Sequence, residues 1–146
     1  MLALIQRVIR AEVTVDAQTV GAIGPGILAL IGVEPGDGDA QVTRMVQRLL
    51  GYRVFADATG RMNRSLTDTE GGLLLVSQFT LAADTSSGMR PGFSTAAPPE
   101  QAERVFDQLV NICRQRHRGG VEIGRFGAHM LINLVNDGPV TFLLRS

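Results

Sequence analysis

Two short polar segments, each next to an apolar run, hold the residues best suited to chemistry in this sequence. Ser77-Gln78-Phe79-Thr80 follows the run 73–76, and Asn136-Asp137-Gly138-Pro139 separates the runs 131–135 and 140–144. Hydroxyl, amide and backbone N–H groups at the end of a strand can hold a substrate carbonyl and stabilise an oxyanion. We therefore expect the chemistry of this chain to lie at these two segments.

Neither hydroxyl of the first segment has a base beside it. A serine or threonine nucleophile needs an adjacent His, Lys or amine, and none is next to Ser77 or Thr80. His129 is distant in sequence, and nothing local places it near them. These residues are therefore better suited to hydrogen bonding and backbone donation; the alternative is that Thr80 is a covalent nucleophile.

The segment Asn136-Asp137-Gly138-Pro139 allows two interpretations. Asp-Gly between two strands is typical of a hairpin turn, and proline is tolerated at the first residue of a strand. However, an X-Pro bond can be cis in folded proteins, and glycine leaves the neighbouring main chain unshielded. In that case the segment forms a rigid tip that presents main-chain groups.

Segment 84–98 has neither helical nor strand periodicity, and loops of this length in compact domains are often functional. Because it places Arg90 and Phe93 close to glycines, it can line a pocket. The alternative is a surface loop with a turn at Pro91-Gly92.

The chain contains no lysine, so all 14 basic residues are arginines, and they balance the 14 acidic residues. Any contact with nucleic acid must therefore be local. The densest basic cluster, Arg114, Arg116 and Arg118 around His117, lies at the end of a predicted helix. These cations either stabilise the helix C-terminus or contact phosphate groups.

Composition predicts one domain, residues 1–146, because this length with 45% hydrophobic residues can bury a single core. No apolar stretch is long enough to cross a membrane, and residues 1–10 do not follow the order of a signal peptide, so we expect a cytoplasmic protein. The single Cys113 and two histidines without a Cys pair predict no metal and no cofactor.

Two amphipathic helices are predicted. Apolar residues recur with helical spacing over 42–50, where Asp37 and Asp39 can cap the start and Gly51 the end. The second helix begins at Pro98-Pro99 and ends near Gly119-Gly120. Its predicted buried stripe comprises Ala102, Val105, Phe106, Leu109, Val110 and Cys113.

Strands are predicted at 11–15, 27–33, 121–123, 130–135 and 140–144, with 27–33 buried on both faces. Gly21–Gly26 lacks the spacing of a phosphate loop and is interpreted as a hairpin turn, and Gly71-Gly72 as a turn that enters a strand. The expected fold is α+β, with two main helices packed on a mixed or antiparallel, barrel-like sheet.

Several motifs together resemble one known family, the D-aminoacyl-tRNA deacylases of the bacterial D-Tyr-tRNA deacylase type. The likeness covers essentially the whole chain. The motifs that carry it are Gln6-Arg7-Val8, Ser77-Gln78-Phe79-Thr80-Leu81, Arg90-Pro91-Gly92-Phe93-Ser94, Ala96-Ala97-Pro98-Pro99, Gly124-Arg125-Phe126-Gly127-Ala128 and Asn136-Asp137-Gly138-Pro139-Val140-Thr141.

The resemblance implies a homodimeric hydrolase that removes D-amino acids, and often glycine, from the 3′ end of tRNA. It implies that the Gly138-Pro139 bond is cis, that this tip selects the substrate by entering the partner's active site, and that Arg7 braces it. Ser77, Gln78, Phe79 and Thr80 would line the site. We also assign supporting roles to Met130, Asn136 and Thr141 and, from the chemistry of the side chains themselves, RNA contacts to Arg90, Phe93, Arg114, Arg116 and Arg118.

Two positions depart from the family pattern, because His129 stands where an acidic residue is expected and Gly92 where serine is common. The first departure leaves the role of position 129 open. Phe79 and Phe93 are either stacking partners for an unpaired base or core residues.

An ester of a ribose is activated, so water can attack it when the carbonyl is held, and the terminal 2′-hydroxyl of the tRNA can replace the missing base. Two other functions stay open at this point. One is a small-molecule hydrolase with a threonine nucleophile, and the other is a ligand-binding oligomer without enzymatic activity. We expect no DNA partner.

Overall fold

The first strand, β1 (Leu2–Val15), organises the sheet because it pairs with three others in the computed structural model, which describes residues 1–146. Its first half pairs antiparallel with β3 (Gly26–Gly32) and its second half with β2 (Gln18–Ile23). The other edge of β1 pairs antiparallel with β8 (Leu131–Arg145) along most of its length. The predicted strand 11–15 is thus the end of a much longer one.

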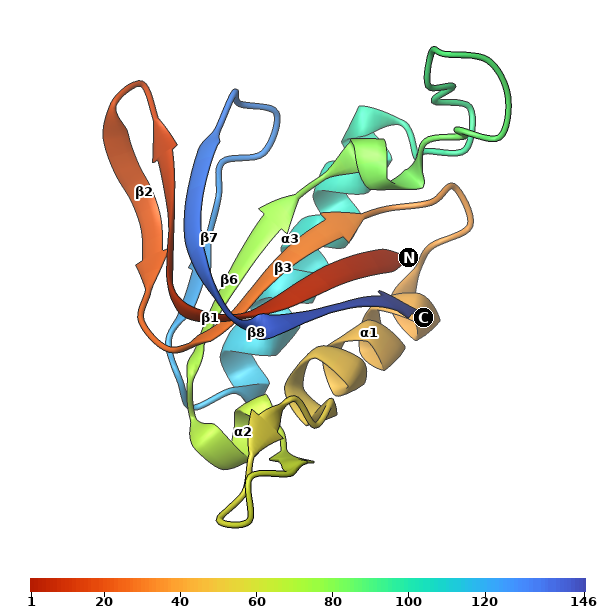
Figure 1. Cartoon of the computed structure of the whole chain (residues 1–146). Coiled ribbons are helices and arrows are strands. Elements are labelled where there is room, and N and C mark those ends of the chain that lie inside the picture. Colours follow the sequence, from red (N-terminus) through yellow and green to blue (C-terminus); the bar gives the residue numbers. More distant parts are fainter.

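Two parallel pairings complete the sheet. β6 (Gly72–Ser77) lies parallel to β3, and β7 (Val121–Ile123) lies parallel to β6. The order is β2-β1-β3-β6-β7, with β8 on β1 (Figure 1). The ends of this path approach each other, since a Cβ on Gly21 would lie 2.5 Å from the carbonyl oxygen of Ile123. The sheet is therefore mixed and nearly closed, which confirms the predicted barrel-like α+β fold.

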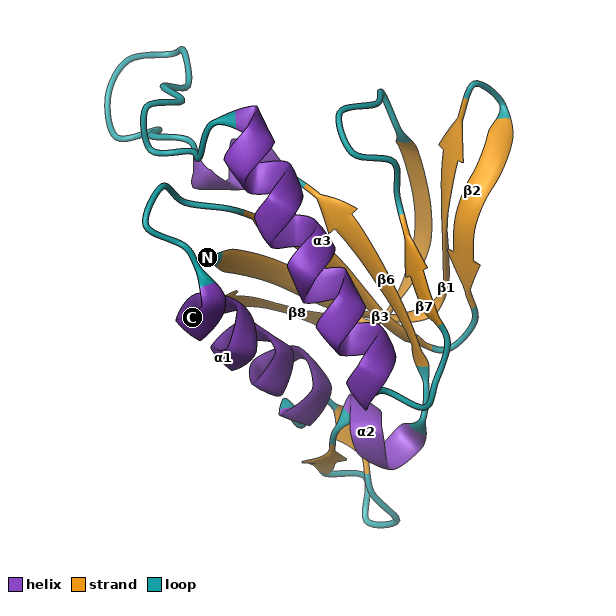
Figure 2. Cartoon of the chain, turned by 180° about the vertical axis from the view of Figure 1, so that it is seen from behind, coloured by secondary structure: helices purple, strands orange, loops and turns teal.

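Both predicted helices form and cover one face of the sheet, as Figure 2 shows. They are α1 (Asp39–Gly51) and α3 (Pro99–Arg116), and every residue of their predicted apolar stripes is buried. Between them and the sheet lies a core cluster that includes Ile5, Leu49 and Leu109. A second cluster, which includes Leu28 and Leu74, lies on the opposite face of the sheet. None of the helices is long and apolar enough to span a membrane.

Local details near α1 differ from the prediction. Asp37 does not cap the helix, because its buried carboxylate contacts the Met1 ammonium at 2.6 Å and accepts from the Glu34 N–H at 2.7 Å. The capping position is Gly38, and Asp39 is the first helical residue. The unpredicted elements include the strand β2, a small hairpin of β4 (Phe55–Ala56) and β5 (Met62–Arg64), and the short helix α2 (Leu66–Thr69).

The predicted hairpin turn at Gly21–Gly26 is wrong, although the turn at Gly71-Gly72 does enter β6. β2 and β3 do not pair with each other, because each pairs with β1. The true hairpin joins β1 to β2 through Asp16 and Ala17, whose φ angles are 50° and 61°. Positive φ at both central residues is the requirement of a type I′ turn.

The hairpin interpretation of Asn136-Asp137-Gly138-Pro139 is also wrong. Residues on both sides of it pair antiparallel with β1, so β8 continues in one direction past the segment. The register shifts between Gln6 and Val8 show that β8 carries extra residues there. The segment therefore bulges out from β8 and forms a tip, as the second interpretation of the sequence predicted.

Candidate functional site

A cavity of about 680 Å³ opens at the end of β6, beside the first turns of α3. Thirteen of its 19 lining residues are hydrophobic, and its volume lies in the usual range of small-ligand sites. The walls come from the end of β3, the 3₁₀ helix η1 (Phe79–Ala82), the loop 93–98, α3 and residues 126–132. This cavity is the candidate active site.

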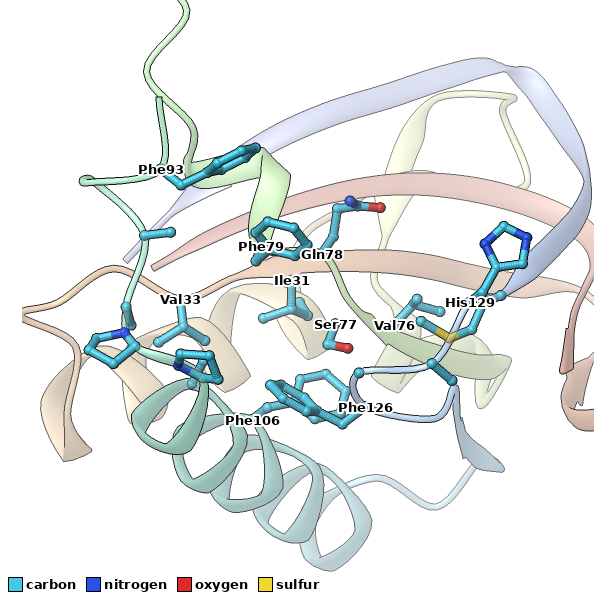
Figure 3. Close-up of a pocket in the computed structure, with 18 of the residues that line it drawn as sticks. Ile31, Val33, Val76, Ser77, Gln78, Phe79, Phe93, Phe106, Phe126 and His129 are labelled. Atoms are coloured by element: carbon cyan, nitrogen blue, oxygen red, sulfur yellow. The ribbon is translucent and has the colours of Figure 1, made fainter. Parts of the chain in front are cut away.

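The sequence-predicted residues Ser77, Gln78 and Phe79 lie together on one wall of the cavity (Figure 3). The Gln78 N–H donates to the carbonyl of Ile31 at 2.7 Å, which is the last bond that ties this segment to β3. The chain then turns into η1. Thr80 does not line the cavity; it is exposed, and its hydroxyl accepts a hydrogen bond from the Gln78 side-chain amide.

Aromatic side chains frame the cavity in two pairs. Phe79 and Phe93 lie with ring centroids 5.2 Å apart and are 57% and 44% exposed, so neither is a core residue. Phe106 and Phe126 form the second pair, 6.3 Å apart, on the side of α3. Phe93 is held by its loop, which two backbone hydrogen bonds of 2.8 Å close between Asp84 and Gly92. Segment 84–98 thus contributes to the pocket, as predicted.

His129 lies at the other end of the cavity from Phe93 (Figure 3), and Met130 also lines the cavity. His129 is the only ionisable side chain among the lining residues, and it is exposed. The Met130 sulfur lies over Gly124, where an added Cβ would be only 2.7 Å from it. Glycine at 124 therefore lets the loop approach this wall.

The peptide bond between Gly138 and Pro139 is cis, and polar side chains hold this tip in place. The Asn136 side chain accepts from the Val140 N–H at 2.9 Å and donates to the Val140 carbonyl at 3.1 Å. Thr141 accepts from the Gln6 side chain at 3.2 Å. Gly138 and Pro139 themselves are exposed.

Arg7 ties the tip to the body of the molecule. Its Nε donates to the Asp137 carbonyl at 3.0 Å and lies 3.0 Å from the Asp137 carboxylate, while its Nη1 donates to the Val54 carbonyl at 2.5 Å. The Arg7 side chain is 15% exposed, so these contacts are partly shielded from water. The Arg7 guanidinium thus holds the tip against Val54, shortly after the end of α1.

The tip and the cavity do not meet within one chain. Asn136 is paired with Val8 of β1, whereas Ser77 is paired with Ile31, which lies opposite Ala3. Five residues along β1 separate the two levels, about 17 Å at ~3.4 Å per residue. Neither Gly138 nor Pro139 lines the cavity.

The arginine cluster also lies away from the cavity, because α3 starts at the cavity wall and runs about 26 Å to Arg116. His117 is buried with Nε2 2.7 Å from the Gly71 carbonyl. Arg90 is exposed on its loop and does not line the cavity.

Cys113 lies in the core, as predicted, and burial raises the pKa of its thiol to about 12. Periodicity alone had assigned Phe106 to the core as well, so its place in the cavity wall was missed, as was that of Phe126. The motif Gly124-Arg125-Phe126-Gly127-Ala128 was the sequence signal that could have indicated the place of Phe126 in the cavity wall.

Comparison with known proteins decides the family. The model of the D-Tyr-tRNA(Tyr) deacylase family matches residues 4–145. The chain belongs to this family. A relative in Xanthomonas oryzae pv. oryzae (strain MAFF 311018), named D-aminoacyl-tRNA deacylase, is 79% identical over 145 residues, 99% of each chain. One of the same name in Stenotrophomonas maltophilia (strain K279a) is 72% identical, also over 99% of each.

Solved structures agree with this D-Tyr-tRNA(Tyr) deacylase fold. One titled "c-Myc DNA Unwinding Element Binding Protein" has a TM-score of 0.96 and 40% identity, covering 100% of this chain and 99% of that one. One titled as a probable eukaryotic D-amino acid tRNA deacylase has a TM-score of 0.79 over 98% and 97% of the chains. At 17% identity, the second likeness concerns the fold alone.

Proposed function

We propose that this protein hydrolyses the ester bond of D-aminoacyl-tRNA, releasing the free D-amino acid and the tRNA, and that it also releases glycine from mischarged tRNA. Membership of the D-Tyr-tRNA(Tyr) deacylase family carries this proposal. The relatives named D-aminoacyl-tRNA deacylase match over nearly the whole chain, so the proposal concerns the entire domain.

The active unit is a homodimer in which the Gly138-Pro139 tip of one protomer enters the cavity of the other. The position of the tip supports this arrangement, since Gly138 and Pro139 are exposed and do not line the cavity of their own chain. Apolar side chains on β8 are also exposed, Leu131 at 60% and Leu143 at 47%. Pairing two copies through this region would cover them.

Selection of the D-isomer follows from the stiffness of the tip. A site that separates mirror images must place an immovable group where only the wrong isomer carries its side chain. Backbone atoms held by Arg7 and Asn136 meet this need, and they make no contact that depends on one kind of side chain. Substrates with different D-side chains and glycine should therefore be accepted.

Water attacks the ester carbonyl, and backbone N–H groups at Phe79 and Thr80 stabilise the oxyanion. The first helical bond of η1 runs from the Leu81 N–H to the Gln78 carbonyl at 3.1 Å, so the N–H groups before it have no partner inside the helix. Thr80 is a poor nucleophile, because its hydroxyl contacts an amide that cannot accept its proton. The 2′-hydroxyl of the terminal ribose assists the water instead.

The 3′ end of the tRNA binds with its last base at Phe79 and Phe93, which are exposed as a stacking pair requires. Arg90 contacts the RNA beside Phe93. Arg114, Arg116 and Arg118 contact phosphates further along the tRNA, consistent with their distance from the cavity. The enzyme works in the cytoplasm without a cofactor, and DNA is not its substrate.

A deacylation assay on matched D- and L-aminoacyl-tRNAs tests the function. The protein should release the D-amino acid at least about 100-fold faster than the L-amino acid, because the clash of the L-side chain with fixed backbone cannot be relieved by repacking. Equal rates on both isomers would refute chiral selection. Release of neither amino acid would favour a binding protein without enzymatic activity.

A substrate whose terminal ribose lacks the 2′-hydroxyl tests the mechanism. The amino acid is then joined through the 3′ oxygen, and turnover should be lost while competition for binding persists. Unchanged turnover would show that a protein group activates the water.

A further inference from the structure

The wall of the cavity holds a single ionisable side chain, His129. Every other lining residue is apolar or a neutral polar residue such as Ser77 or Gln78. The substrate, however, is an anion at its 3′ end, because a phosphodiester precedes the terminal nucleoside. A phosphate that approaches this cavity therefore meets only one side chain in its wall that can carry a positive charge.

The backbone that carries His129 is fixed while its side chain is free. The Gly124 N–H donates to the Leu75 carbonyl at 2.9 Å, and the Ala128 N–H donates to the Arg125 carbonyl at 3.2 Å. Leu131 then begins β8 opposite Thr14. His129 itself is exposed at the mouth of the cavity, opposite the end where Phe93 lies (Figure 3).

We propose that His129 donates an N–H hydrogen bond to the phosphate that joins the last two nucleotides of the substrate. This inference rests on the proposed function and deepens it. With the terminal base at Phe79 and Phe93, the nucleoside spans the cavity and its 5′ phosphate lies at the opposite end. His129 is then a substrate-binding residue, whose contact with the phosphate holds the terminal nucleotide in the cavity equally before and during the chemical step.

This role differs in its kinetics from that of a general base. A base acts in the chemical step, so its loss lowers kcat. A phosphate contact exists before and during that step, so its loss raises KM and leaves kcat unchanged.

Variants at position 129 separate these roles in deacylation assays. His129→Gln should raise KM about tenfold, the worth of one charge-assisted hydrogen bond at an exposed site, with kcat unchanged. His129→Asp should raise it further by repulsion, and His129→Arg should restore it. A loss of kcat at unchanged KM, or a lower KM in His129→Asp, would overturn the proposal.

Direct binding of 5′-AMP and adenosine, measured by calorimetry, isolates the phosphate. The wild-type protein should bind 5′-AMP about tenfold more tightly than adenosine, and His129→Gln should bind both equally. Arg125→Gln is the control, since Arg125 is exposed on the same loop but does not line the cavity. An equal preference for 5′-AMP in wild type and His129→Gln would overturn the proposal.

These binding measurements do not depend on turnover. If the wild-type protein fails to deacylate tRNA while its preference for 5′-AMP depends on His129, the proposed function fails and the phosphate contact stands. If turnover is observed and the preference for 5′-AMP does not depend on His129, the proposed function stands and the phosphate contact fails.

Discussion

The cavity and the Gly138-Pro139 tip hold their functional groups by opposite means. The cavity is made of apolar side chains packed from β3, α3 and the loop 93–98, and its polar groups lie on the surface of that packing. The tip has exposed main chain that polar side chains hold in place, chiefly Arg7 and Asn136. Because the cavity and the tip do not meet in one chain, we propose that they are complementary parts of a site shared by two chains.

This difference predicts different sensitivities to mutation. Apolar packing is spread over many contacts, so a conservative change in the cavity wall is partly absorbed. The tip depends on a few directed hydrogen bonds, so the loss of one partner should move the backbone to which we assign selection of the substrate. The largest effects on turnover are therefore expected at the tip.

Gly138→Ala should cause the largest loss. An added Cβ would overlap the backbone nitrogen of Val140, so the tip must move. Since a displacement of about 1 Å at a site can cost about 100-fold, kcat/KM on D-aminoacyl-tRNA should fall at least ~100-fold. Gly120→Ala is the control, because nothing lies within 4 Å of a Cβ there. Full activity of Gly138→Ala would show that the tip is not part of the active site.

Arg7→Met should lower kcat/KM about 30-fold, because the tip loses its tie to Val54 and Asp137 through charge-assisted bonds. Arg7→Lys should recover little, since an ammonium cannot reproduce the fork of donors. Arg10→Met, at an exposed position on the same strand, should have no effect. A parallel loss in Arg10→Met would mean that net charge, and not the position of the tip, controls turnover.

Thr80→Ala should have a small effect, within about fivefold, because it removes one neutral hydrogen bond at the edge of the cavity. Removal of a true nucleophile costs about a millionfold in kcat in well-studied hydrolases. Single-turnover rates distinguish these outcomes, and an inactive variant would restore the threonine-nucleophile alternative.

The smallest effect is expected from thiol reagents. Burial raises the pKa of Cys113 to about 12, so the reactive thiolate is almost absent at neutral pH. Iodoacetamide should modify the thiol only in denaturant and leave turnover unchanged. Labelling of the native protein, followed by mass spectrometry, would show that α3 and the cavity wall open readily.

Prediction from the sequence succeeded where local periodicity decides the structure. The stripes of α1 and α3 and the doubly buried β3 follow directly from apolar spacing, and all are observed. Of the two interpretations of Asn136-Asp137-Gly138-Pro139, the turn is wrong and the tip is observed, because pairing of both flanks with β1 outweighs the local turn signal. Asp37 was misassigned for a similar reason, since its partner is the distant Met1 ammonium.

The candidate site was predicted in part. Polar residues at strand ends, such as Ser77 and Gln78, are visible in sequence because they interrupt an apolar pattern. Phe106 is not, since a helix residue that lines a cavity has the same spacing as one that fills a core. The separation of tip and cavity depends on strand register, which only the fold reveals.

A mixed dimer tests the shared site most directly. One subunit carries Gly138→Ala and the other carries Ser77→Tyr, which obstructs the cavity, and the two are copurified through different tags. Turnover should be about half that of the wild-type dimer, since one cavity and one opposing tip stay intact. The reciprocal dimer, with both changes in one subunit and none in the other, should be inactive. Activity in the reciprocal dimer and none in the first would show that each tip serves its own chain and would contradict the account.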